Sequence, residues 1–219
     1  MNKNNYISLA KKAANIQISE LKKIKKIFNK SFVKAVDLIL GCKGKVIFAG
    51  IGKSGLIARK ISATFSSVGI PSFFCDPAQA LHGDMGQIEK KDILIVFSYS
   101  GNTSELNNML KYANRYGIKI IGVASKPESI LLKASDVKLV LPKVKEADLT
   151  GIVPTSSTTI TLLLGDCMAT TVMHQKKFSK EKFKVFHPGG NIGKSLLLAK
   201  DIMISGSKMP VVNYKKSFK

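Results

Sequence analysis

The chain has 219 residues, 45% of them hydrophobic, and a formal charge of +21 because 35 Lys and Arg residues outnumber 14 Asp and Glu residues. This length favours one main domain with extensions, and the hydrophobic fraction is sufficient for a full core. No apolar run approaches the roughly 18 residues of a membrane-spanning helix, and the N-terminus lacks the apolar core of a signal peptide. The three cysteines, Cys42, Cys75 and Cys167, are widely spaced and favour reduced core residues over disulfides or zinc ligands. We therefore expect a cytoplasmic protein without a membrane partner.

The positive charge raises the question of nucleic-acid binding, but two features argue against a specific interaction. The excess is almost entirely lysine, with Arg59 and Arg115 as the arginines, whereas readers of bases and phosphates usually also use the bidentate arginine fork. The lysines are also scattered, with clusters only near residues 22–34 and at the tail. We expect no specific nucleic-acid partner, only weak and salt-sensitive adhesion to polyanions.

Residues 6–40 show helical spacing of apolar residues opposite a lysine-rich face, which predicts an N-terminal extension (residues 1–40) of one or two amphipathic helices packing on a core or a partner subunit. From residue 43 the chain alternates apolar strand-like runs with helical patterns. This alternation predicts an α/β fold, a doubly wound three-layer αβα sandwich around a five-stranded parallel sheet. The expected strands are 46–49, 72–75, 93–97, 119–124 and 137–141, and the expected helices between them are 54–68, 103–116 and 127–134.

The loop after the third expected strand has the strongest functional pattern in the chain. The run 93–97 is purely apolar, and a turn rich in hydroxyl residues with a central glycine separates it from the next helix. Backbone N–H groups and the positive end of a helix dipole meet at such a turn, which favours a bound phosphate. Capping of the helix alone needs one hydroxyl, whereas this loop supplies four. The predicted phosphate-binding residues are Ser98, Ser100, Gly101 and Thr103, with Glu105 placed to reach the rest of the ligand.

A second glycine-rich turn, residues 50–55, follows the first expected strand and fits the G-x-G-x-x-G pattern of dinucleotide-binding folds. Asp76 ends the next strand, where a ribose-binding acid would be expected. Lys53, however, lies inside the turn, where a pyrophosphate needs bare backbone. A monophosphate held between the two loops uses both of them, with Gly52 and Ser54 as further contacts and Lys53 as a cation near the ligand.

The last third of the chain is less informative. Residues 154–175 predict an apolar helix, and the hydroxyl residues Thr155 to Thr159 at its start fit helix capping as well as ligand contact. Next comes the irregular segment Phe186-His187-Pro188-Gly189-Gly190 and then a basic tail from Lys200. The position of His187 on this segment indicates a mobile piece that folds over a site.

Six stretches follow one another in order and at unbroken spacing over about residues 40–200: GCKGKVIFAGIGKSGLIARK, TFSSVGIPSFF, ALHGDMG, SYSGNTSE, KEADLTGIVPTSSTT and FHPGGNIGKSLLL. Together they resemble the sugar isomerase (SIS) family, and among its members the bacterial D-arabinose 5-phosphate isomerases. The resemblance implies a flavodoxin-like SIS domain at residues 41–199, a homotetramer with shared sites, and interconversion of D-ribulose 5-phosphate and D-arabinose 5-phosphate. The product would supply 3-deoxy-D-manno-octulosonate for lipopolysaccharide. The catalytic residues implied by motif are Lys53, His82, Glu105, Glu146 and His187.

The chain departs from that pattern in two places. Longer family members continue from an Asp-Ile-Met segment into paired CBS regulatory modules, whereas here residues 200–219 form a basic tail that resembles a remnant of the linker. Regulation through those modules is therefore expected to be absent. Asp76 also stands where the family often has a histidine associated with metal, so Asp76 and His82 are weak metal candidates and an inhibitory zinc ion is doubtful.

Aldose–ketose isomerisation through an enediol needs a base, an acid and a group that stabilises the oxyanion, and it needs no redox cofactor. The candidate histidines, glutamates and lysine can supply these roles, but the residues alone do not identify the general base. His82 also fits a helix-capping core residue, and Glu146 also fits a surface carboxylate beside Lys143 and Lys145. Two alternatives stay open: a non-catalytic sugar-phosphate sensor, and an isomerase for a hexulose 6-phosphate or heptose 7-phosphate.

Overall fold

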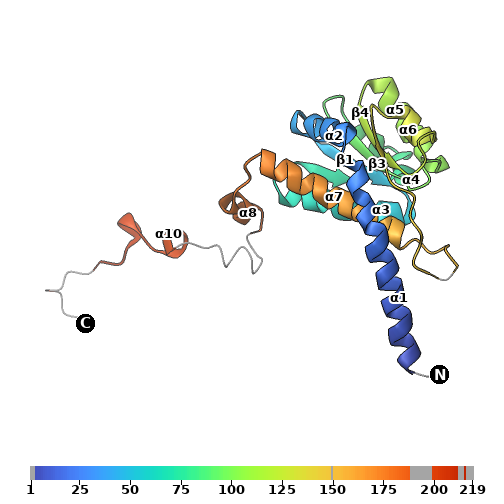
Figure 1. Ribbon diagram of the computed structural model, residues 1–219. Helices are drawn as coiled ribbons and strands as arrows, with labels where there is room; N and C mark the ends of the chain where they lie inside the picture. The colour runs from blue at the N-terminus through green and yellow to red at the C-terminus, as the bar shows by residue number, and fades with distance from the viewer. Residues whose placement is uncertain (1–2, 149, 188–198, 212–214, 216–219) are drawn as a thin grey trace. The chain divides into compact units, whose positions relative to one another are not determined.

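The five apolar runs form one fully parallel sheet in the computed structural model, which describes residues 3–148, 150–187, 199–211 and 215 (Figure 1). The strand order β2-β1-β3-β4-β5 reverses direction after β1, the first strand in the chain. Gly50 at the end of β1 lies opposite Phe97 at the end of β3, so the loops that follow these two strands begin side by side. The strands are β1 (Val46–Gly50), β2 (Ser72–Phe74), β3 (Ile93–Phe97), β4 (Lys119–Ala124) and β5 (Val137–Val140).

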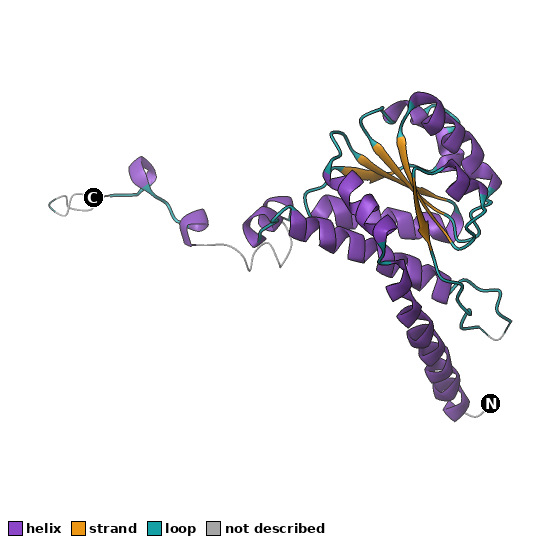
Figure 2. Ribbon diagram, turned by 45° about the horizontal axis from the view of Figure 1, so that its top comes forward, coloured by secondary structure: helices purple, strands orange, loops and turns teal. Residues whose placement is uncertain are grey.

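Helices cover both faces of the sheet (Figure 2). Because successive side chains of a strand point to opposite faces, Phe48 and Phe97 enter one buried cluster while Ile47 and Val96 enter the other. The first cluster packs against α2 (Lys30–Leu40), α3 (Gly52–Ser67) and α7 (Ser156–Gln175). The second packs against α4 (Pro77–Ala80), α5 (Asn107–Tyr116) and α6 (Ile130–Ala134). The predicted three-layer αβα sandwich is therefore confirmed.

The N-terminal stretch forms α1 (Lys3–Leu21), the 3₁₀ helix η1 (Lys22–Ile27) and α2, as predicted for one or two helices. Ile24, Ile27 and Val36 pack into the first buried cluster. Between η1 and α2, Phe28 is 42% exposed, and Asn29 caps α2 by accepting the Ser31 N–H. The C-terminal half of α1 packs on α7, where Thr159 Oγ1 donates to Gln17 Oε1 at 3.0 Å. The first half of α1 extends away from the sheet (Figure 1).

Several element boundaries differ from the sequence-based ranges. The predicted helix 127–134 is only Ile130–Ala134, because the Ser129 hydroxyl caps it by accepting the Leu132 N–H. The predicted helix 103–116 opens as a 3₁₀ turn, η3 (Ser104–Leu106), before α5. A further 3₁₀ turn, η2 (Asp84–Gln87), precedes β3.

Contacts divide the chain into two compact units, Met1–Phe178 and Ser179–Lys219, and each is described by itself. The sheet and its helices belong to the first unit. The second contains α8 (Lys180–Phe186), α10 (Ala199–Ile202) and the 3₁₀ turn η4 (Gly206–Lys208). The predicted boundaries at residues 40 and 199 stay predictions. Among the helices of the described residues, none combines the length and the apolar character needed to cross a bilayer.

Candidate functional site

A cavity of about 410 Å³ opens beyond the carboxyl end of β1. Parallel α/β sheets bind ligands at this edge, where the strand order reverses, and here the reversal falls between β1 and β3. Three parts of the chain meet around the cavity: the start of α3, the loop after β3, and residues 146–161. Its polar lining includes Lys53, Ser54, Tyr99, Glu146, Ser157 and Thr158.

The start of α3 is a glycine turn without a side-chain cap. Gly52 has a φ of +56°, and the residue before it, Ile51, is an extended N-cap whose side chain makes no capping hydrogen bond. A Cβ at Gly55 would lie 2.5 Å from the Gly50 carbonyl oxygen, so this turn requires glycine for the close approach of α3 to β1. The positive end of the α3 dipole is thus left without a side-chain cap where Lys53 and Ser54 line the cavity.

The hydroxyl-rich loop after β3 is tied into a closed turn by its own side chains. Ser98 is buried, and its Oγ lies 2.9 Å from Thr103 Oγ1 and accepts the Gly101 N–H at 3.1 Å. Ser100 Oγ accepts the Asn102 N–H at 3.3 Å, and Gly101 supplies a φ of +70°. These predicted phosphate residues lie together at the sheet edge, but they shape the loop and do not line the cavity within the described residues.

Tyr99 is the residue of this loop that lines the cavity, and sequence reasoning missed it. Burial raises the pKa of its phenol, partly offset by a hydrogen bond from the Val144 N–H. The available signal was a single bulky aromatic among small hydroxyl and glycine residues. Ser157 and Thr158, left open between capping and ligand contact, also line the cavity.

Glu146 precedes α7 in the chain, but its carboxylate contacts the first residues of that helix, so it is more than a surface carboxylate. Its Oε2 accepts the Thr155 N–H at 2.7 Å, the Thr155 hydroxyl at 2.9 Å and the Ser157 N–H at 3.3 Å. Burial raises the pKa of this carboxyl, but hydrogen bonds from Ser157 and Thr155 outweigh burial and hold the pKa below its usual value. The structure therefore presents an ionised carboxylate in the same cavity as Lys53.

Glu105 is exposed at η3 and does not line this cavity. Its carboxylate accepts the Ser104 hydroxyl at 2.8 Å. A hydrogen bond from its own backbone N–H, and to a lesser extent the one from the Ser104 hydroxyl, lowers the pKa of this carboxyl.

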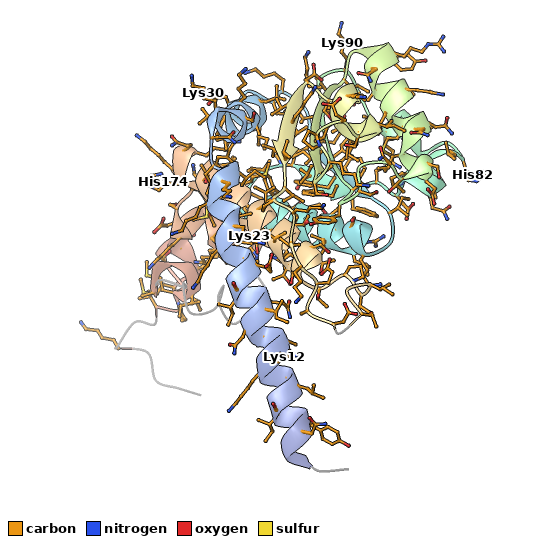
Figure 3. All side chains as sticks on the ribbon, turned by 45° about the vertical axis from the view of Figure 1, so that its right-hand side comes forward. Lys12, Lys23, Lys30, His82, Lys90 and His174 are labelled. Atoms are coloured by element: carbon orange, nitrogen blue, oxygen red, sulfur yellow. The ribbon has the colours of Figure 1, made fainter. Side chains whose placement is uncertain are left out.

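The weak metal candidates Asp76 and His82 lie on either side of α4. Asp76 caps α4, with its Oδ1 accepting the Ala78 N–H at 2.9 Å, and His82 is exposed in the following turn. Figure 3 shows the His82 side chain at the outer edge of the molecule, directed away from it. Within the described residues, no three His, Cys, Asp or Glu side chains gather as metal ligands. The doubtful inhibitory zinc ion stays untested.

His187 ends α8 in the second unit. Its Nδ1 lies 2.8 Å from the Phe183 carbonyl oxygen, and its ring stacks on the Phe183 ring with centroids 3.8 Å apart. The predicted meeting of His187 with Lys53 involves both units and stays a prediction. Residues 188–198, which contain the rest of the Pro-Gly-Gly motif, lie outside the described residues.

The fold is that of a sugar isomerase domain, and the SIS domain family model matches residues 39–171. The chain therefore belongs to the SIS domain family. Its curated relatives include arabinose 5-phosphate isomerase KdsD of Pseudomonas aeruginosa, 46% identical over 83% of this chain and 56% of that protein. KdsD of Escherichia coli K12 is 40% identical over 91% of this chain and 61% of that protein.

A solved structure has the same fold. An Escherichia coli CFT073 protein in complex with arabinose 5-phosphate aligns with a TM-score of 0.83 and 35% identity, covering 86% of this chain and all of that one. The KdsD relatives named above are longer than this chain, which spans 56% to 61% of their length.

Proposed function

We propose that this protein is an aldose–ketose isomerase that interconverts D-ribulose 5-phosphate and D-arabinose 5-phosphate. The observation that carries the proposal is the cavity in which the uncapped start of α3, with Lys53 and Ser54, meets the ionised Glu146. The relatives named arabinose 5-phosphate isomerase support the choice of sugar. In this scheme the start of α3 and the hydroxyl loop after β3 hold the phosphate.

The reaction moves hydrogen between C1 and C2. A base removes a proton from C1 of the ketose, the C2 carbonyl oxygen gains a proton as the enediol forms, and a proton returned to C2 gives the aldose as O1 is deprotonated. The ketose substrate and the aldose product are at the same oxidation level, so we propose that no redox cofactor takes part. Lys53 stabilises the developing oxyanion or the phosphate. Glu146 is a candidate for proton transfer, and Glu105, His82 and His187 remain proposed participants without an assigned step.

The proposal extends to the wider role of the protein. D-arabinose 5-phosphate would supply 3-deoxy-D-manno-octulosonate for lipopolysaccharide.

The enzyme would work as a homotetramer with sites shared between subunits. Exposed apolar side chains on the free half of α1, such as Ile7 at 59% and Leu9 at 43%, support an interface there. Light scattering on the purified protein should give four times the 23.8 kDa chain mass; the mass of a single chain would contradict the tetramer.

Incubation with D-ribulose 5-phosphate in heavy water, followed by NMR, tests the reaction and the sugar together. The expected product is D-arabinose 5-phosphate carrying deuterium at C2, because the transferred proton exchanges with solvent at the base. A parallel incubation with a hexulose 6-phosphate and a heptose 7-phosphate serves as the specificity control. Unchanged ketose, with sugar-phosphate binding retained, would favour the sensor and overturn the proposal.

His187 is proposed to take part in proton transfer. His187→Ala should lose most turnover while the protein stays folded, because a general acid or base contributes about 10² to 10⁴ in rate. Circular dichroism and steady-state rates measure the two effects. His174→Ala, on exposed surface near the end of α7, is the matched control. A wild-type rate in His187→Ala would remove this histidine from the mechanism.

A further inference from the structure

Residues 142–147, here called the strap, connect the end of β5 to the turn before α7 and carry Glu146 into the cavity. The strap has no regular secondary structure. Its backbone is nevertheless held by side chains from distant parts of the chain. Three of its N–H groups, those of Val144, Lys145 and Ala147, each donate to a side-chain oxygen.

Tyr99 holds the first part of the strap. Its hydroxyl accepts the Val144 N–H at 3.0 Å and donates to the Pro142 carbonyl oxygen at 3.4 Å. The Tyr99 backbone is itself fixed, because its carbonyl oxygen accepts the Ser125 N–H at 2.8 Å and the Ser125 hydroxyl at 2.7 Å. Tyr99 therefore links Ser125, which follows β4, to the strap, through its backbone on one side and its hydroxyl on the other.

Glu20, near the end of α1, holds the next residue. Its Oε2 accepts the Lys145 N–H at 3.0 Å, and its side chain is only 13% exposed. Lys23 joins the arrangement by pairing with Glu20 and donating to the Lys143 carbonyl oxygen at 3.3 Å. Glu20 and Lys145 are 125 positions apart in the sequence, so this contact links α1 to the cavity.

We propose that Tyr99 and Glu20 are positioning residues, which fix the strap so that the Glu146 carboxylate keeps its place in the cavity opposite Lys53. The inference rests on the proposed function, since it assigns Glu146 a part in proton transfer. A misplacement of about 1 Å at a reacting group costs roughly 10²-fold in rate. A segment without helix or sheet hydrogen bonds needs such anchors, because its amides otherwise exchange their partners for water.

Tyr99→Phe tests the first anchor, because it deletes the hydroxyl and keeps the ring. Tyr112→Phe is the matched control, since its hydroxyl donates to the Ile88 carbonyl oxygen at the same 3.4 Å in the other core cluster. We expect kcat to fall at least 10-fold in Tyr99→Phe with KM changed less than threefold, and wild-type kinetics in Tyr112→Phe. Unchanged kcat in Tyr99→Phe would overturn the proposal for this residue.

Two NMR readouts judge the positioning without reference to turnover. Amide exchange of Val144 and Lys145 should accelerate in Tyr99→Phe, and the pKa of Glu146, titrated through its side-chain ¹³C signal, should rise toward its usual value. Lys53 and Tyr99 are the other titratable groups lining the cavity; Tyr99→Phe removes the second, so the Lys53 titration is followed alongside. If the wild-type protein does not isomerise the sugar, the proposed function fails while these readouts still decide the positioning. If Tyr99→Phe leaves both the amide exchange of Val144 and Lys145 and the pKa of Glu146 unchanged, the positioning role of Tyr99 is overturned.

Glu20 is tested by rescue. Glu20→Ala removes the acceptor for the Lys145 N–H and should accelerate exchange of that amide and lower kcat. Glu20→Gln keeps an acceptor oxygen at the same position and should restore both largely to wild-type values. If Glu20→Ala leaves the Lys145 exchange rate and kcat unchanged, Glu20 does not position the strap. If Glu20→Gln fails to restore them, the ion pair with Lys23 and not the hydrogen bond to Lys145 is responsible, and this result also overturns the proposal for Glu20.

Discussion

At the scale of single residues, the cavity brings a lysine and a carboxylate into one small volume. Lys53 comes from a glycine turn, and Glu146 comes from a segment 93 positions later in the chain numbering. Neither residue is explained by the needs of the fold alone. Lys53 lies exposed where a glycine turn needs only small residues. Glu146 accepts the Thr155 and Ser157 N–H groups from a position well before α7, whose N-cap residue is Thr155. Both therefore make direct targets for substitution.

Lys53→Ala should lose most turnover while the protein stays folded. An exposed lysine contributes little to packing, whereas removal of a group that stabilises transition-state charge costs about 10² to 10³ in rate. Steady-state rates with D-ribulose 5-phosphate and thermal unfolding measure the two effects. Lys60→Ala, which breaks only a surface pair with Asp166 on α7, is the control. A wild-type rate in Lys53→Ala would exclude this lysine from the chemistry.

Glu146→Gln should destabilise the protein in a pH-dependent manner. The folded-state pKa of Glu146 lies below its usual value, so the ionised carboxylate adds stability above that usual value, about 4.3, and this contribution is lost as the pH falls through the folded-state pKa. Urea unfolding should show a loss of about 1 kcal/mol at pH 7, as for a charged helix cap, and a smaller loss at about pH 3, below the usual pKa of the carboxyl.

The control for this measurement is Glu128→Gln, whose carboxylate is 86% exposed beside Lys133. It should change stability little at either pH, because an exposed pair contributes about 0 to 1 kcal/mol. An equal loss at both pH values in Glu146→Gln would show that the effect comes from shape and not from charge.

At the scale of elements, the close packing of α3 on α7 sets the back of the cavity, because both helices line it. A Cβ at Gly165 of α7 would lie 2.2 Å from Cδ1 and 2.5 Å from Cγ1 of Ile61 on α3. Ile61 is fully buried, so it has little room to move. Glycine is therefore required in the middle of α7 despite its poor helix propensity.

Gly165→Ala should destabilise the protein by about 1 to 2 kcal/mol, because overpacking costs about 1 to 3 kcal/mol and the gain in helix propensity returns up to about 1 kcal/mol. Ile61→Ala supplies the matched background, since it removes the atoms that the new methyl group meets. In that background Gly165→Ala should be neutral or stabilising in urea unfolding. Additive effects of the two substitutions would contradict a steric contact between these positions.

At the scale of elements, local sequence patterns predicted some features of the fold and missed others. Strand positions and the two strand-end loops were predictable, because apolar runs and glycine turns depend on neighbouring residues. The hydroxyls of the 98–103 loop were correctly grouped, but their mutual hydrogen bonds were not foreseen, since a run of Ser and Thr does not reveal which hydroxyl faces a ligand. The short extent of α6 follows from the capping hydroxyl of Ser129, one of several residues in that stretch able to cap.

At the scale of the whole molecule, the charge of +21 is the dominant feature. Most of the lysines that the structure describes lie exposed, spread over both layers of helices and on α1; Figure 3 labels Lys12, Lys30 and Lys90 on three separate parts of the surface. Such a distribution attracts any polyanion without reading its sequence.

Fluorescence anisotropy with short duplex DNA should therefore show weak binding that is lost as salt rises. For six to ten phosphate contacts the affinity should fall about 10³- to 10⁵-fold between 50 and 200 mM salt, equally for unrelated sequences. A scrambled duplex of the same length is the control. Binding that survives 200 mM salt, or that prefers one sequence, would contradict a purely electrostatic surface.

The sequence by itself determined the layered α/β fold, the parallel sheet and the positions of the two strand-end loops, because hydrophobic period and glycine turns are local properties of the chain. Only the tertiary structure decided that Glu146 caps α7 inside the cavity, that Tyr99 lines it, and that Glu20 reaches the Lys145 amide from α1. These contacts join residues far apart in the sequence. Their geometry depends on how helices pack on both faces of the sheet, and no pattern within a short window of the sequence encodes it.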